Sequence, residues 1–220
     1  MTSRSNTKDR ILEASTLLFR RQGYEGTGLK EIVAKGRAPW GSLYHFFPQG
    51  KEQLGVEVVM RYGEYYRCLL ENYFVESSSV IQAVRDIFTA SATELVDSDF
   101  ANGCPIVGVA LDAMNSSSYL RQACAEIINS WVATLASGLV VAGISESLAR
   151  DVATSIVSGL EGGTVLSRIT RSTRPLMSAS DAAVMAIRSA LSDEWRRESS
   201  TRLESLLFEG DLKTGHDQCS

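Results

Sequence analysis

Cysteine and histidine are the most reactive side chains available in this sequence. The cysteines are Cys68, Cys104, Cys124 and Cys219, and the histidines are His45 and His216. No two cysteines have Cys-x-x-Cys spacing and the histidines are far apart, so the pattern predicts no zinc site. A redox sensor needs a thiol of low pKa beside cations, whereas Cys104 and Cys124 have mainly small or apolar neighbours. We expect reduced thiols, with Cys104 and Cys124 buried by packing, and neither metal nor cofactor.

An enzyme using Cys104 as a nucleophile or His45 as a base is one alternative interpretation. The sequence offers no recognisable Ser/His/Asp set, no carboxylate pair at catalytic spacing and no phosphate-binding glycine loop. We therefore expect no enzymatic activity.

The residues from Ala38 to Leu54 predict a short helix with one packing face and one exposed polar face. At 3.6 residues per turn, Leu43, Phe46 and Phe47 share one side, Gly41, Tyr44 and His45 lie opposite, and Trp40 and Ser42 fall at the margins. A glycine lets the backbone approach a base edge or phosphate, and a tyrosine hydroxyl binds phosphate. Lys51, at the start of the following helix, adds a cation beside free N–H groups. The stretch predicts a DNA-reading helix that begins at Ala38 or Pro39.

Two earlier helices would position that reader. Residues 8–22 have apolar side chains at helical spacing and end at Gly23. A second helix should run to about Lys35 with Thr27 as its N-cap, the Thr27 hydroxyl serving either the cap or a phosphate. Three short helices with a tight link form a helix-turn-helix unit, which places its last helix in the major groove.

Two sets of residues resemble a known family. Ile11–Phe19, Gly23, Thr27, Ile32, Gly41–Tyr44, Phe47 and Lys51–Leu54 resemble the N-terminal domain of TetR-family transcriptional regulators. Gly103–Ile106, Val109–Ala113 and Leu160–Gly163 resemble the LmrA/YxaF-like branch of that family. The resemblance implies an all-α fold with a helix-turn-helix DNA-binding domain over 1–52 and a helical ligand-binding and dimerisation domain over 53–198. We expect residues 199–220 to form a polar tail.

The DNA-binding residues follow from this motif, with one departure. Where the family usually has Ala-Gly-Val-Ser before the reading helix, this chain has Gly36-Arg37-Ala38-Pro39, so Arg37 is the candidate replacement phosphate contact. The candidate DNA contacts are Thr27, Arg37, Trp40, Gly41, Ser42, Tyr44, His45 and Lys51. The departure leaves open an alternative, a ligand-binding dimer whose reader has lost sequence specificity.

The second domain should consist of long helices. Spacing predicts helices over 51–74, with a stripe of Leu54, Val58, Tyr62, Tyr65 and Leu69, and over 80–96, 119–141 and 147–170. A short helix should start at Gly103–Pro105, and a final one, capped by Ser178 and Asp181, should cover 179–197. The resemblance implies that helices 147–170 and 179–197 form the homodimer interface.

The resemblance also implies a small-molecule effector among the middle helices. Candidate ligand contacts are Phe88, Leu111, Met114, Ile127, Trp131 and Glu161, although each alone is more often a core residue. Glu161 is the best polar candidate because a carboxylate among apolar residues needs a partner. The effector expected is small and hydrophobic or aromatic.

Charge and composition complete the prediction. Of the net charge of −4, residues 1–54 carry +4 and the remainder −8, so the positive charge lies on the DNA reader. No apolar run approaches the roughly 20 residues of a membrane span, and the N-terminus lacks a signal-peptide core. We expect a bacterial cytosolic homodimer that represses transcription from an inverted-repeat operator in double-stranded DNA and is released by its ligand.

Overall fold

The computed structural model describes the backbone of residues 4–211 and the side chains of residues 7–192. Within residues 4–211 the chain forms nine α-helices and no strand. They are α1 (Arg4–Gln22), α2 (Leu29–Lys35), α3 (Trp40–Phe46), α4 (Lys51–Glu76), α5 (Val80–Asp97), α6 (Pro105–Ala113), α7 (Ser118–Val141), α8 (Glu146–Thr170) and α9 (Arg174–Asp211). The all-α prediction is confirmed.

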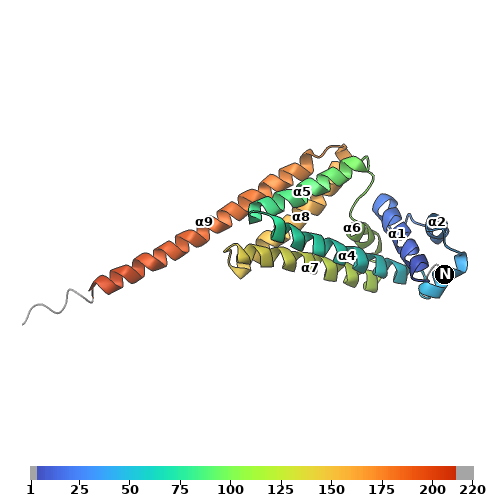
Figure 1. Cartoon of the computed structure of the whole chain (residues 1–220), viewed down its shortest axis with the longest axis horizontal. Helices are drawn as coiled ribbons and strands as arrows, with labels where there is room; N and C mark the ends of the chain where they lie inside the picture. Colours follow the sequence, from blue (N-terminus) through green and yellow to red (C-terminus); the bar gives the residue numbers. More distant parts are fainter. Residues whose placement is uncertain (1–3, 212–220) are drawn as a thin grey trace, which may run out of the picture.

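The first three helices form a small unit at one end of the molecule (Figure 1). Ile11 and Phe19 of α1, Ile32 of α2 and Leu43 of α3 are fully or almost fully buried, and Phe47 closes α3 onto the same core. Helix α4 leaves this unit and continues into the rest of the chain, so it belongs to both parts of the molecule.

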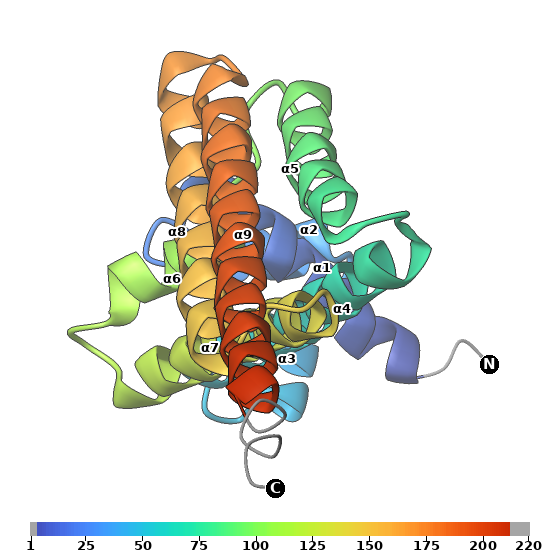
Figure 2. The same ribbon diagram turned by 90° about the vertical axis from the view of Figure 1, so that its left-hand side faces the viewer.

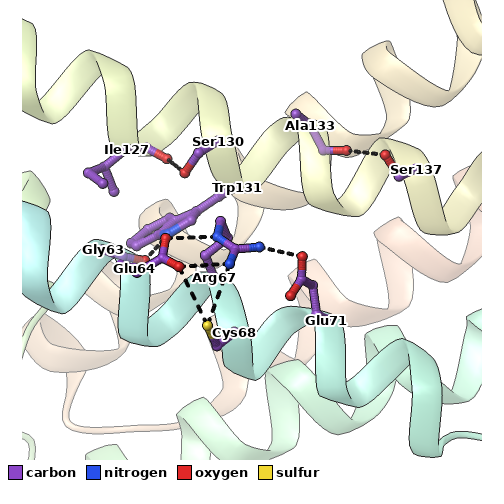
Figure 3. Close-up of polar contacts among 10 residues, drawn as sticks. All are labelled: Gly63, Glu64, Arg67, Cys68, Glu71, Ile127, Ser130, Trp131, Ala133 and Ser137. Atoms are coloured by element: carbon purple, nitrogen blue, oxygen red, sulfur yellow. Dashed lines mark hydrogen bonds and ion pairs between the residues drawn. The ribbon is translucent and has the colours of Figure 1, made fainter.

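Helices α4 and α7 pack against each other along the middle of the molecule. The indole N–H of Trp131 donates to the Gly63 carbonyl oxygen at 2.9 Å, as Figure 3 shows. A side chain at position 63 would place its Cβ 2.4 Å from Cγ2 of Ile127, so this close approach requires glycine. Within α4, Arg67 pairs with Glu64 and Glu71 (Figure 3).

Helix α7 differs from the expectation that no segment could cross a bilayer. By length and composition it meets that requirement, alone among the helices of the described residues. A single such helix is weak indication of a membrane span, because core helices of soluble proteins have the same composition. Leu120, Ile127, Trp131 and Leu135 of α7 are buried in the common core.

Helices α8 and α9 lie side by side and form one face of the molecule (Figure 2). Gly163 of α8 allows the close approach, since a Cβ there would lie 3.0 Å from Cα of Leu176. Val165, Leu166 and Ile169 on α8 and Met185 on α9 are nevertheless exposed. The hairpin therefore presents uncovered apolar side chains.

The final helix is longer than predicted at both ends. It begins at Arg174 rather than 179, so Ser178 and Asp181 lie inside the helix and do not cap it. Arg174-Pro175 starts it, because proline is accommodated in a first helical turn. It continues to Asp211, beyond the residue 199 at which the polar tail was expected, and projects past the other helices. Residues 212–220, with His216 and Cys219, lie outside the described residues.

Candidate nucleic-acid interface and effector cavity

Helix α3 has the two faces that its sequence predicts. Leu43 and the following Phe47 are fully buried and Phe46 is partly buried, whereas Gly41, Tyr44 and His45 are exposed. A Cβ added at Gly41 would meet no atom within 4 Å, so nothing in this chain requires the missing side chain. The outward face of α3 is flat at Gly41 and polar at Tyr44 and His45.

Two large aromatic side chains mark this outward face. Trp40 and Tyr44 are 46% and 48% exposed, and their rings meet edge to face with centroids 5.9 Å apart. The pair gives α3 a preformed surface beside Gly41, and Ser42 lies at its margin with partial exposure.

The structure corrects the role of Thr27 and the start of α3. Gly28, not Thr27, is the N-cap of α2. Thr27 is buried and its hydroxyl donates to the Gly23 carbonyl oxygen at 2.7 Å, so the side chain ties the turn after α1 and is not part of the exposed surface. Pro39 is the N-cap of α3, which begins at Trp40, after the Ala38 or Pro39 at which the helix was expected to start.

Arg37 and Lys51 lie at the two edges of the reader. Arg37 is exposed in the tight turn before α3 and has φ of 47°, a conformation uncommon for a residue with a side chain. Lys51 begins α4, with its ammonium 4.4 Å from the centre of the Tyr24 ring. Arg37 is thus exposed to solvent, whereas the Lys51 ammonium contacts the Tyr24 ring and lies 3.5 Å from the Glu25 carbonyl oxygen.

A cavity of about 40 Å³ lies between α1, α4, α5, α7 and α8. Its lining combines charged, aromatic, small polar and aliphatic residues with one thiol: Arg20, Tyr62, Tyr66, Ser91, Glu94, Leu95, Asn102, Gly103, Cys104, Trp131, Leu160, Glu161 and Thr164. Trp131 and Glu161 were predicted as ligand contacts and both line it. Phe88 and Ile127 are buried core residues outside its described lining, and Leu111 and Met114 are exposed at the surface.

The sequence-based prediction missed Tyr62, Tyr66 and Arg20 as cavity residues. The Tyr62 and Tyr66 rings stack with centroids 6.2 Å apart, and Tyr66 lies 4.9 Å from Trp131. Tyr65 was placed on the buried stripe of α4 but is mostly exposed. The four-residue spacing of Tyr62 and Tyr66 is the only sequence signal that identifies this wall.

Burial shifts the titration of the cavity groups. Desolvation raises the pKa of Glu161 to about 7, partly offset by its hydrogen bond with Cys104. Burial, and then the nearby Glu161 carboxylate, raise the pKa of the Cys104 thiol well above its ordinary value. Desolvation likewise raises the pKa of Tyr62 and Tyr66. The thiol therefore stays protonated near neutral pH, and Glu161 is the group that titrates there.

Arg20 joins the DNA reader to the cavity wall. Its Nε donates to the Gly103 carbonyl oxygen at 2.9 Å, and its Nη2 lies 2.5 Å from Oε1 of Glu94. The Gly103 N–H returns a hydrogen bond to the Arg20 carbonyl oxygen at 2.9 Å, and the guanidinium lies over the Tyr62 ring. One side chain of α1 thus contacts the 98–104 loop, α5 and α4.

The same 98–104 loop is held from its other side by α8. Arg168 donates to the carbonyl oxygens of Phe100 and Ala101 at 3.3 and 3.0 Å. Arg171 pairs with Asp99 at 2.5 Å. The 98–104 loop, which joins α5 to α6, therefore contacts the reader, lines the cavity and is bonded to the end of α8.

Comparison with known proteins agrees with this architecture. Residues 11–58 match the family model described as bacterial regulatory proteins, tetR family, and residues 80–182 match transcriptional regulator LmrA/YxaF-like, C-terminal domain. The chain is 36% identical to the uncharacterised HTH-type transcriptional regulator YxaF of Bacillus subtilis, over 80% of this chain and 93% of that protein. It is 33% identical to HTH-type transcriptional regulator LmrA of the same organism, with the same coverage.

Solved structures share the fold. A TetR transcriptional regulator from Legionella pneumophila superposes with a TM-score of 0.74 at 24% identity, covering 83% of this chain and 97% of that one. Transcriptional regulator FadR from Bacillus subtilis, in complex with stearoyl-CoA, superposes with a TM-score of 0.62 at 14% identity, covering 81% and 96%. With a helix-turn-helix reader matched at one end and an LmrA/YxaF-like domain at the other, the chain belongs to the TetR family of transcriptional regulators, in its LmrA/YxaF-like branch.

Proposed function

We propose that this regulator is a homodimeric repressor that binds an inverted-repeat operator and is released by a small molecule in the α4–α8 cavity. The observation that carries the proposal is the outward face of α3, where Gly41, Tyr44 and His45 are exposed while Leu43 is fully buried. In a dimer, two such helices about 34–36 Å apart would enter successive major grooves.

Each exposed residue of the reader has a separate role in the proposal. Tyr44 and Arg37 bind phosphate, Gly41 admits the DNA backbone or a base edge, and His45 reads a base. Trp40, Ser42 and Lys51 flank them. Because phosphate contacts are independent of sequence, only the change at His45 should alter base preference.

The homodimer would form through α8 and α9. The exposed apolar residues Leu166, Ile169 and Met185 support this interface, since an apolar surface of this kind marks a protein contact. Sedimentation of Ile169→Glu tests the assignment. Val141→Glu is the matched control, because Val141 on α7 is 90% exposed and Ile169 is 72% exposed. Only the α8 variant should yield monomers.

Selection of the purified protein against a random duplex library tests operator binding. We expect an enriched inverted repeat whose affinity exceeds that of a scrambled duplex at two salt concentrations. Equal binding of both duplexes would contradict a sequence-specific repressor. It would favour the alternative of a reader that binds DNA without sequence specificity. That alternative rests on the departure of Gly36–Pro39 from the sequence usual in the family.

Effector release requires that the ligand prefer the conformation that does not bind DNA. The cavity supports this role because Arg20, which lies in its wall, belongs to α1 of the reader. A ligand that displaces Arg20 or the 98–104 loop changes the position of α1. Relatives of this family are transcriptional regulators, and we place the protein with them in the bacterial cytoplasm.

A further inference from the structure

We propose that the effector is a small organic ammonium ion, held by the Glu161 carboxylate and by the aromatic rings of Tyr66 and Trp131. The inference rests on the proposed function in one respect, that the cavity is the effector site. It goes further by assigning the charge and the size of the ligand.

The aromatic wall is the first observation. Tyr62 and Tyr66 stack nearly parallel, at 10°, and Trp131 meets Tyr66 with centroids 4.9 Å apart. The polar edges of two rings are occupied: Trp131 donates to Gly63, and the Tyr66 hydroxyl lies 3.3 Å from the Ser91 hydroxyl. These bonds fix Tyr66 and Trp131, and the negative faces of fixed aromatic rings attract cations. The Tyr62 ring already carries a cation, the Arg20 guanidinium, 5.6 Å from the ring centroid.

The second observation is a carboxylate without a cation. Two carboxylates line the cavity, and Glu94 is already paired with Arg20 at 2.5 Å. For Glu161 the described residues supply a thiol partner, Cys104, and no ion pair. A partly buried carboxylate with only a neutral partner is costly to ionise, which is why burial raises the pKa of Glu161 to about 7. A cationic ligand supplies the charge that the fold leaves out.

The size of the cavity limits the ligand. Its volume of about 40 Å³ corresponds to roughly three water-sized spheres, at about 10–15 Å³ each. That space suits a compact head group such as a methylated ammonium. A neutral ligand of the same shape would fill the cavity but leave the Glu161 carboxylate unpaired, and so would gain less from binding.

A cation at this position also acts on the reader. It would approach Arg20, which carries the same charge, and offer Glu94 a second positive partner. Both effects weaken the contact between Arg20 and Glu94. Binding of a cation therefore weakens the attachment of α1 to the cavity wall. Release from DNA requires such a coupling between the cavity and the reader.

The charged and titratable groups facing Glu161 allow a pH test. They are Arg20, Glu94, Tyr62, Tyr66 and Cys104. The raised pKa values of Cys104 and both tyrosines keep these three groups neutral at pH 6 to 8. Over that range Glu161 passes from largely protonated to largely ionised, so cation affinity should rise about tenfold from pH 6 to pH 8.

The experiment compares methylammonium with methanol, an uncharged molecule of the same number of heavy atoms, by calorimetry on the full-length protein. We expect methylammonium to bind at least about tenfold more tightly than methanol at pH 8, a difference of about 1.4 kcal/mol. Glu161→Gln should remove the preference. Glu126→Gln, an exposed carboxylate of α7 outside the cavity lining, is the matched control and should retain it.

Equal affinity for the two probes, an unchanged methylammonium affinity in Glu161→Gln, or no binding of either probe would overturn the proposal. Circular dichroism of Glu161→Gln checks that the variant is folded. Operator selection is independent of this measurement. Failure to enrich an operator would count against the repressor while leaving the methylammonium result intact. Tighter binding of the neutral probe would refute a cationic effector while leaving the cavity as the effector site.

Discussion

Replacing Arg20 with methionine tests whether one side chain holds the reader against the second domain. Methionine keeps most of the apolar stem and removes the guanidinium. The change removes the hydrogen bond to the Gly103 carbonyl oxygen and the pairing with Glu94, while the backbone bond from Gly103 to the Arg20 carbonyl oxygen remains possible.

The magnitude follows from burial. The Arg20 side chain is only 14% exposed, so its hydrogen bond to Gly103 should contribute in the range of about 1.5–3 kcal/mol for charged donors. Glu94 is 48% exposed, so solvent screening reduces the ion pair to about 0.5 kcal/mol. We expect Arg20→Met to lower the free energy of unfolding by about 2 kcal/mol, and Glu94→Gln by about 0.5 kcal/mol.

Urea denaturation at one fixed protein concentration measures both variants and the double variant, since the stability of a dimer depends on concentration. Hydrogen exchange of α1 should accelerate in Arg20→Met, because the helix loses its side-chain link to the cavity wall. A loss below about 0.5 kcal/mol for Arg20→Met would refute the reasoning. So would a Glu94→Gln loss equal to that of Arg20→Met, because the ion pair would then carry the energy assigned to Gly103.

Three further predictions concern the reader and the cavity. Gly41→Ala should leave the free energy of unfolding unchanged or raise it by about 0.5–1 kcal/mol through helix propensity, since a Cβ at this position meets no atom of the chain. The same change should weaken operator binding in a gel-shift titration. Undiminished affinity would place Gly41 away from DNA. Tyr44→Phe should weaken specific and random duplexes alike, whereas His45→Ala should change the base preference, and unchanged binding in both variants would refute the reading face. Because the pKa of Glu161 is about 7 in the folded protein and near 4.3 when unfolded, ionisation destabilises the fold as pH rises from about 4 to 7. Glu161→Gln should therefore be more stable than the native protein at pH 8, by up to about 4 kcal/mol, with the gap shrinking toward pH 5 in thermal melts.

The reader could be predicted from sequence because its signals are local. Within two turns, the positions of Leu43 and Phe47 predict the buried face of α3, and those of Tyr44 and His45 predict its exposed face. Thr27 shows the limit of local reasoning. A threonine before a helix is a common N-cap, but the turn after α1 brings the Gly23 carbonyl oxygen to its hydroxyl, and Gly28 takes the cap position.

The cavity could be predicted only in part, because its walls come from distant segments. A helical stripe continues at either three or four residues, so sequence alone could not decide between Tyr65 and Tyr66 beside Tyr62. Contact with Trp131 of α7 decides for Tyr66. Leu111 and Met114 were chosen for apolar type, but both lie at the surface.

Arg20 was missed for a different reason. On α1 it reads as a basic residue of the last turn, a position that the helix dipole explains without any distant partner. Its partners Glu94 and Gly103 lie more than 70 residues further along the chain, and no spacing within α1 indicates them.

The shared 98–104 loop has a thermodynamic consequence for the bound DNA. If effector binding loosens the operator complex by a given factor, operator binding must weaken the effector by the same factor, whatever route connects the two sites. The cavity residues Asn102 and Gly103 adjoin the contact with Arg20. The DNA-bound protein should therefore bind the effector more weakly than the free protein does. Regulator molecules bound to their operators would then need higher effector concentrations for half-saturation than molecules free in solution. The dose at which a promoter opens would depend on how many copies of the regulator the cell holds.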